Sequence, residues 1–170
     1  MGIVSFFKEA GEKLFGSKET EAAAAAAAQA PSQAELQERA RAANEAAGKA
    51  IEKYIAAQGL SADGLRVEFD GASCTVTVSG QAADQATKEK ILLCCGNVQG
   101  VASVADLMTV AQPADESQYH TVVKGDTLSA IAKKFYGNAN LYPKIFEANK
   151  PMLGHPDKIY PGQLLRIPKN

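Results

Sequence analysis

The sequence predicts an α+β protein in which two small units follow a short amphipathic helix. Three observations lead to this fold class. The 170 residues suffice for two compact units with modest cores. Residues 45–111 change between helical and strand periods in the order α-β-β-α-β, which favours helices on one face of a small sheet. Residues 119–169 give the order β-α-α-β, after a polar joint at residues 112–118.

Residues 1–16 are predicted to form the amphipathic helix and to dock on the first unit. Charged residues interrupt this segment, and its apolar residues fall at helical spacing on one face: Ile3, Phe6, Phe7, Ala10 and Leu14. A helix on a membrane surface is the alternative, but such helices usually carry more Lys and Arg. Residues 17–44 contain seven successive alanines and little that can be buried, so they are predicted to form a linker or a marginal helix.

The first unit begins with a helical stripe of apolar residues that ends at Gly59. Two strands follow around the hairpin signal Asp70-Gly71, and the second alternates apolar with polar residues. A helix stopped by Gly96-Asn97 and a third strand complete the unit. The predicted bounds after the stripe of Ala47, Ile51, Tyr54 and Ile55 are Arg66–Asp70, Cys74–Ser79, Asp84–Cys95 (with Ile91, Leu92 and Cys95 inward) and Val101–Val110.

The second unit is predicted from turn signals that separate short apolar segments. Its elements are a strand at Tyr119–Val123, a helix capped by Gly125-Asp126-Thr127 and ended by Gly137, a second helix from Asn140 to before Pro151, and a strand at Leu164–Ile167. In the first of these helices the inward side chains are Leu128, Ile131, Ala132 and Phe135.

The charge balance and the hydropathy of the chain argue against binding to nucleic acid and against insertion into a membrane. The 18 basic and 19 acidic residues give a net charge of −1, so no basic field is present to hold a nucleic-acid backbone. No segment approaches the roughly 20 apolar residues of a membrane span. The opening residues also lack the pattern of a secretory signal. We therefore expect a cytoplasmic protein without stable membrane insertion, and we also expect it to be a monomer.

Catalysis is not expected from this sequence. An enzyme needs a nucleophile with a base, or a metal site, and the only histidines are His120 and His155, both predicted at the surface or rim. The common catalytic motifs are absent. The three cysteines are interpreted as reduced, because Cys94 and Cys95 are adjacent and poorly placed for a mutual disulfide.

Successive parts of the chain resemble known families. The segments YHTVVKGDTLSAIAKKFYG, IFEANK and KIYPGQLLRIP strongly resemble the LysM module, and DGASCTVTVSG with KEKILLCCGNVQGVASV resembles the BON domain. Joined to MGIVSFFKEAGEKLF, they resemble the bacterial cytoplasmic potassium-binding BON–LysM proteins, with the Ala-rich linker outside the resemblance. Cys94 and Cys95 stand where that family more usually has small aliphatic residues.

This resemblance implies K⁺ binding or sensing, with compaction on binding and a role in ionic or osmotic stress. It implies that main-chain carbonyls hold the ion, and the matching positions are Phe7, Ala10, Gly96, Val98 and Val101. Neutral carbonyl oxygens are the ligands that select K⁺, and the loop at residues 96–101 follows a helix end whose carbonyls lack intrahelical partners. The spacing alone favours an ordinary helix-to-strand connection with a glycine C-cap.

The LysM resemblance implies a second function, the binding of N-acetylglucosamine polymers in a shallow groove. The matching positions are Gly125, Asp126, Thr127, Leu128 and Ile159. The structural alternative is that Asp126 and Thr127 cap a helix while Leu128 fills the core. A third class of function is docking on a protein or lipid surface, because BON domains elsewhere are associated with phospholipid membranes.

Overall fold

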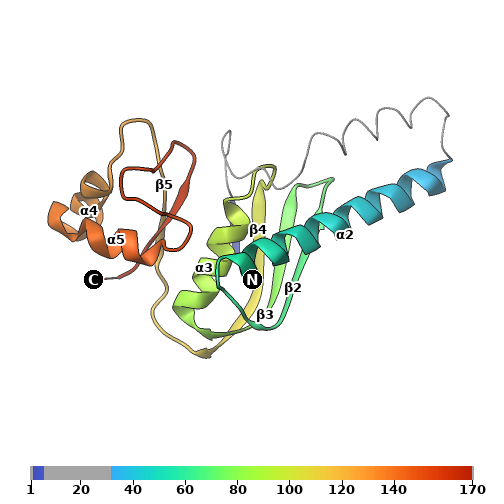
Figure 1. The fold of residues 1–170 in the computed structure, drawn as a ribbon, viewed down its shortest axis with the longest axis horizontal. Coiled ribbons are helices and arrows are strands. Elements are labelled where there is room, and N and C mark those ends of the chain that lie inside the picture. Colours follow the sequence, from blue (N-terminus) through green and yellow to red (C-terminus); the bar gives the residue numbers. More distant parts are fainter. Residues whose placement is uncertain (1, 6–31, 170) are drawn as a thin grey trace.

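The computed structural model describes residues 2–5 and 32–169, and it confirms the predicted α+β class and the order of elements in both units. The first module is built from α2 (Gln33–Ala57), β2 (Asp63–Asp70), β3 (Thr75–Asp84), α3 (Gln85–Gly96) and β4 (Ser103–Gln112), and β1 (Gly2–Ser5) joins its sheet. The strand order is β1-β4-β3-β2, with β3 and β4 parallel and the two outer pairs antiparallel. Both helices lie against one face of this sheet, as Figure 1 shows.

The prediction of a helix from the first residues is wrong for Gly2–Ser5, which form a strand. This strand pairs along the outer edge of β4, with Gly2 opposite Asp106 and Ser5 opposite Ser103. An edge strand presents unpaired N–H and C=O groups, and pairing with β1 satisfies them. The remainder of the predicted amphipathic segment, including Phe7 and Ala10, lies outside the described residues.

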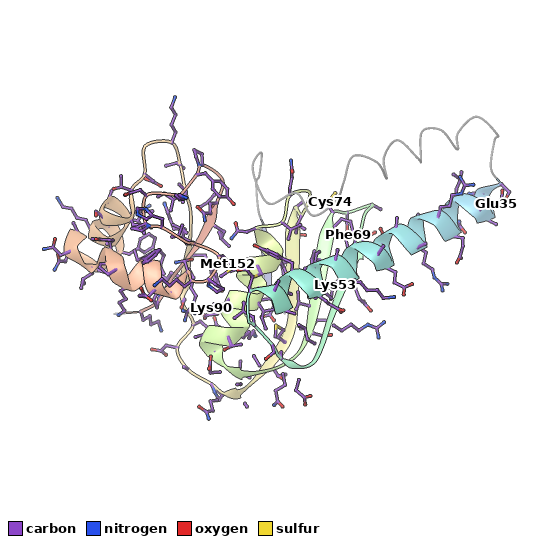
Figure 2. All side chains as sticks on the ribbon, viewed as in Figure 1. Glu35, Lys53, Phe69, Cys74, Lys90 and Met152 are labelled. Carbon is purple, nitrogen blue, oxygen red and sulfur yellow. The ribbon has the colours of Figure 1, made fainter. Side chains whose placement is uncertain are left out.

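Helix α2 begins at Gln33, inside the stretch predicted to be a linker or a marginal helix. Ser32 and Glu35 form a capping box, in which the Ser32 hydroxyl accepts from the Glu35 N–H at 3.3 Å and the Glu35 carboxylate accepts from the Ser32 N–H at 2.8 Å. The first turns are exposed and extend beyond the sheet, and Figure 2 labels Glu35 at their tip. No helix within residues 32–169 is long and apolar enough to cross a bilayer.

Helix α3 is buried on more sides than the sequence pattern predicts. Ile91 and Cys95 face the core of the first module as predicted, and Leu92 packs partly against it. Leu93 and Cys94 are buried as well, because the second module covers the face of α3 that would otherwise meet solvent. Burial raises the pKa of the Cys95 thiol, and the neighbouring Cys94 raises it further.

The turn between β2 and β3 differs from the prediction at one residue. Cys74 was expected to begin the second strand and to share its buried face, but it lies in the turn with φ +52°. The strand begins at Thr75, and Val76 and Val78 are fully buried. A left-handed residue is part of the turn geometry rather than of a strand, which explains the shift of one residue.

The second module has the predicted order and packs around a small core of its own. Its elements are β5 (Gln118–Thr121), α4 (Leu128–Tyr136), the 3₁₀ turn η1 (Ala139–Leu141), α5 (Tyr142–Ala148) and β6 (Leu164–Ile167), with β5 and β6 antiparallel. Gly137 ends α4, as predicted, and the structure shows it in the left-handed conformation. Asn140 does not open a helix directly, because it lies in η1 and α5 starts at Tyr142.

Candidate functional site

The loop after α3 is a tight, buried turn. The Asn97 N–H bonds back to the carbonyls of Leu93 and Cys94, and the Val98 N–H bonds to that of Cys95 at 3.2 Å. The side chains of Val98 and Val101 are buried in the core of the first module. Gly100 adopts φ +91°, a conformation that favours glycine, and the chain then enters β4.

Three of the five predicted ion ligands, Gly96, Val98 and Val101, lie together in this loop. The turn and loop hydrogen bonds of the described residues use the carbonyl of Val98, which accepts from the Val101 N–H at 3.3 Å, but not those of Gly96 or Val101. A carbonyl oxygen has two lone pairs, so the bond to Val98 leaves acceptor capacity. The loop therefore offers neutral main-chain oxygens at a helix end, where they carry partial negative charge.

Strand β1 runs toward the same loop. Its register places Gly2 opposite Asp106 and Ser5 opposite Ser103, so β1 runs along β4 toward the first residue of that strand, two positions after Val101. Phe7 and Ala10, the other two predicted ligands, lie outside the described residues. Within residues 2–5 and 32–169, no three His, Cys, Asp or Glu side chains gather as they would in a metal centre of charged side-chain ligands.

Asn97 joins the loop to the second module through two hydrogen bonds. Its side-chain amide donates to the Leu164 carbonyl at 3.1 Å and accepts from the Leu164 N–H at 3.1 Å. Asn149 makes the same pair with Arg166, at 2.8 Å in both directions. Leu164 and Arg166 lie two residues apart on β6, so the two asparagine side chains satisfy the edge of β6 that faces away from β5.

A buried ion pair forms the second contact between α3 and β6. The Arg166 guanidinium donates to the Glu89 carboxylate at 2.5 Å, and the two side chains are only 10 % and 3 % exposed. Gln85 and the backbone N–H of Ser117 also donate to Glu89, at 2.9 and 2.8 Å. One carboxylate thus connects α3, the segment between the modules and β6. Its hydrogen bonds compensate for the loss of water around the charge.

The boundary between the modules also contains a sulfur contact and a cleft. The Cys94 thiol lies 3.1 Å from the Met152 sulfur, and Figure 2 labels Met152 between the two modules. A cleft of about 430 Å³ opens beside this contact. It is lined by residues from the end of α2, the loop after α3 and the segment before β6, among them Tyr54, Gln58, Asn97, Met152, Lys158 and Tyr160.

The predicted carbohydrate positions mostly have structural roles. The Asp126 carboxylate accepts from the Val123 N–H at 3.0 Å and lies 2.8 Å from His120 Nε2, and these hydrogen bonds lower the pKa of Asp126. Thr127 caps α4 through the Ala130 N–H. Leu128 fills the core, Ile159 packs partly against the same core, and Gly125 is exposed.

Glu89, Asn97 and Arg166 were not predicted as interface residues, and Asn149 was not predicted to support Arg166 within the second module. A signal for two of them was present, because Gln85, Glu89, Leu93 and Asn97 recur every four residues and therefore lie on one side of α3. Polar residues in such a row ordinarily indicate a solvated face. Here all four are buried, and Glu89 and Asn97 bond to Arg166 and Leu164 of β6.

The comparisons with known proteins agree with the two modules. The BON domain model matches residues 43–112, and the LysM domain model matches residues 120–168. The fold and its sequence thus define a two-module BON–LysM protein.

Among similar proteins, the potassium binding protein Kbp of Escherichia coli O6:H1 is 45% identical over 169 residues, which cover 99% of each chain. The chain belongs to the family of this protein. An uncharacterized protein of Deinococcus radiodurans is 42% identical over 83 residues, covering 42% of this chain and 32% of that protein. An esterase of Mycobacterium tuberculosis H37Rv is 52% identical over 48 residues, which cover 28% of this chain and 10% of the esterase.

Proposed function

We propose that this chain is a cytoplasmic protein that binds and senses K⁺ and has no catalytic activity. The observation that carries the proposal is its identity of 45% with a potassium binding protein over 99% of both chains. The loop after α3 supports it on physical grounds, because uncharged carbonyl oxygens are the ligands that select K⁺. The expected ligands are the main-chain oxygens of Phe7, Ala10, Gly96, Val98 and Val101.

Binding is expected to make the protein more compact. A ligand that binds only the ordered arrangement stabilises it, and the proposed ligands come from two segments that are distant in the sequence. The role we propose is that of a monomeric sensor in ionic or osmotic stress. Contacts between the loop and the second module would extend the effect of the ion to the whole molecule.

Calorimetry or amide NMR with K⁺ tests the proposal, with Na⁺ as the reference at constant ionic strength. We expect heat and amide shifts at residues 96–101 with K⁺ and neither with Na⁺. Equal responses to both ions, or no response to K⁺, would refute K⁺ selectivity. Deletion of residues 1–16 tests the two ligands outside the described residues: unchanged affinity would remove Phe7 and Ala10 from the site.

Two glycine substitutions distinguish an effect on the loop from the strain that a side chain causes at any residue with positive φ. Gly100→Ala places a side chain at φ +91°, and nothing within 4 Å would clash with it, so the change strains the loop alone. Gly137→Ala does the same at φ +73° at the end of α4, away from the loop. We expect K⁺ affinity to fall at least tenfold in Gly100→Ala and to remain within twofold of wild type in Gly137→Ala. Equal effects would remove the loop from the proposal.

The match of residues 120–168 to the LysM domain favours a second candidate function, the binding of N-acetylglucosamine polymers. Of the five carbohydrate positions, Gly125 is exposed, whereas Asp126, Thr127 and Leu128 are engaged in the turn, the cap and the core. Titration with N-acetylglucosamine oligomers, followed by amide NMR, tests this function. Shifts at residues 123–128 with the sugar, together with no response to K⁺, would make it the better proposal.

A further inference from the structure

We propose that β6 of the second module positions the ion-binding loop through Asn97, so that docking of the LysM module and K⁺ affinity depend on each other. This inference rests on the proposed function, because it assigns a positioning residue to the same site. Asn97 is not expected to touch the ion. Its role is to hold the peptide units on either side of it in place.

Asn97 lies at the start of the loop, directly after the last residue of α3. Its N–H belongs to the same peptide unit as the carbonyl of Gly96, and its own carbonyl leads into Val98. The N–H is bonded to the end of α3, and the side chain is bonded to both polar groups of Leu164. The peptide that carries the Gly96 oxygen is therefore held at two points, one in each module.

The bond between Asn97 and Leu164 resembles the pairing of two strands. The Asn97 amide donates and accepts at 3.1 Å, as a neighbouring strand would, and its side chain is buried. Two hydrogen bonds from one planar amide fix its orientation as well as its distance. Loss of docking would leave the N–H and C=O of Leu164 without these partners and release the side chain that orients the loop.

Strand β6 is also held against α3 by a second contact. Arg166 on β6 bonds to Glu89 on α3, about two turns before Asn97. The strand is thus attached to the helix at both Glu89 and Asn97, which fixes its direction relative to the end of α3. Asn149 supports Arg166 from within the second module, through an amide pair that does not involve the loop.

Docking of β6 and K⁺ affinity are related by thermodynamic linkage. If docking of β6 holds the loop oxygens in the binding geometry, then K⁺ must stabilise docking by the same factor as docking increases K⁺ affinity. The effect is reciprocal and can be measured from either side. It appears as weaker binding when the Asn97 contact is removed, and as a smaller population of the undocked state when the ion is present.

Asn97→Ala and Asn149→Ala are matched variants of the full chain, because each removes one amide pair from β6 and only the first alters the loop. By calorimetry with K⁺ against Na⁺, we expect affinity to fall at least tenfold in Asn97→Ala and by less than threefold in Asn149→Ala. Thermal unfolding of both variants is the control, and we expect the difference in K⁺ affinity not to follow the difference in stability. Wild-type affinity in a folded Asn97→Ala variant would overturn the inference while leaving K⁺ binding intact.

Hydrogen exchange of the wild-type protein tests the inference without a mutation. It therefore remains usable if Asn97→Ala does not fold. Undocking exposes the Leu164 N–H but leaves the Arg166 N–H bonded to Asn149. We therefore expect saturating K⁺ to slow exchange at Leu164 at least tenfold relative to Na⁺ and to change Arg166 much less. Equal slowing at both sites would overturn the inference. Absence of any K⁺ response in calorimetry would instead refute the proposed function itself.

Discussion

Removal of the Glu89 carboxylate should destabilise the protein more than removal of any exposed acidic side chain. In Glu89→Ala, the Arg166 guanidinium keeps a position where its side chain is only 10 % exposed, but it loses its charged partner at 2.5 Å. Breaking a buried ion pair by removing one partner costs about 3–5 kcal/mol. The Ser117 N–H and the Gln85 amide lose their acceptor as well. The expected loss is a large part of the stability of a small protein.

Urea unfolding followed by circular dichroism measures this loss, and Glu147→Ala is the matched control. Glu147 also pairs with a basic residue, Lys150 at 2.7 Å, but both side chains are about half exposed or more. The control should change the free energy of unfolding by less than about 0.5 kcal/mol. If Glu89→Ala lowered the free energy of unfolding no more than Glu147→Ala does, the ion pair would have no role in joining the modules. The double variant Glu89→Leu, Arg166→Met should recover much of the loss, because it leaves no unpaired charge.

The same site predicts how stability depends on pH. Burial alone raises the pKa of Glu89, but hydrogen bonds from Gln85, Ser117 and Arg166 outweigh burial and hold the pKa below its usual value of 4.5. A carboxyl with a lowered pKa in the folded state stabilises the protein above the unfolded pKa, and this contribution is lost as the pH falls toward the folded pKa. The difference in stability between wild type and Glu89→Gln should therefore be constant above about pH 5 and shrink below it. A difference that grew as the pH fell would contradict this sign.

Two further predictions concern local structure. Gly48→Ala should destabilise the protein by about 1–3 kcal/mol in thermal unfolding, although Ala usually favours a helix, because the added Cβ would lie 2.4 Å from the Val67 carbonyl oxygen. Gly154→Ala, where nothing lies within 4 Å, should be nearly neutral, and equal effects of the two changes would refute the steric argument. Asp126→Ala should cost about 1–2 kcal/mol through its lost hydrogen bonds to Val123 and His120, with amide NMR changes confined to residues 120–128. Changes spread over the first module would contradict that assignment.

The candidate site was only partly predictable from the sequence. Gly96, Val98 and Val101 were placed in one loop by a helix-stop signal followed by a strand, and the structure brings them together. The partner of Asn97 was not predictable, because Leu164 lies 67 positions further along the chain. No local pattern specifies which backbone groups an amide will meet after two modules dock.

The periodicity of the sequence determined most elements of both modules, because a repeat of two or of about 3.6 residues reflects burial against the nearest layer. Turn and helix-end signals, rather than periodicity, gave the strand Leu164–Ile167 and the stop of α4 at Gly137 as the structure has them. The tertiary structure alone decided that Gly2–Ser5 pair with β4, since a free strand edge is a property of the assembled sheet. It also decided that the polar row on α3 is an interface rather than a solvated face. A buried charge such as Glu89 is tolerated only beside its partner Arg166, and that partner comes from the other module.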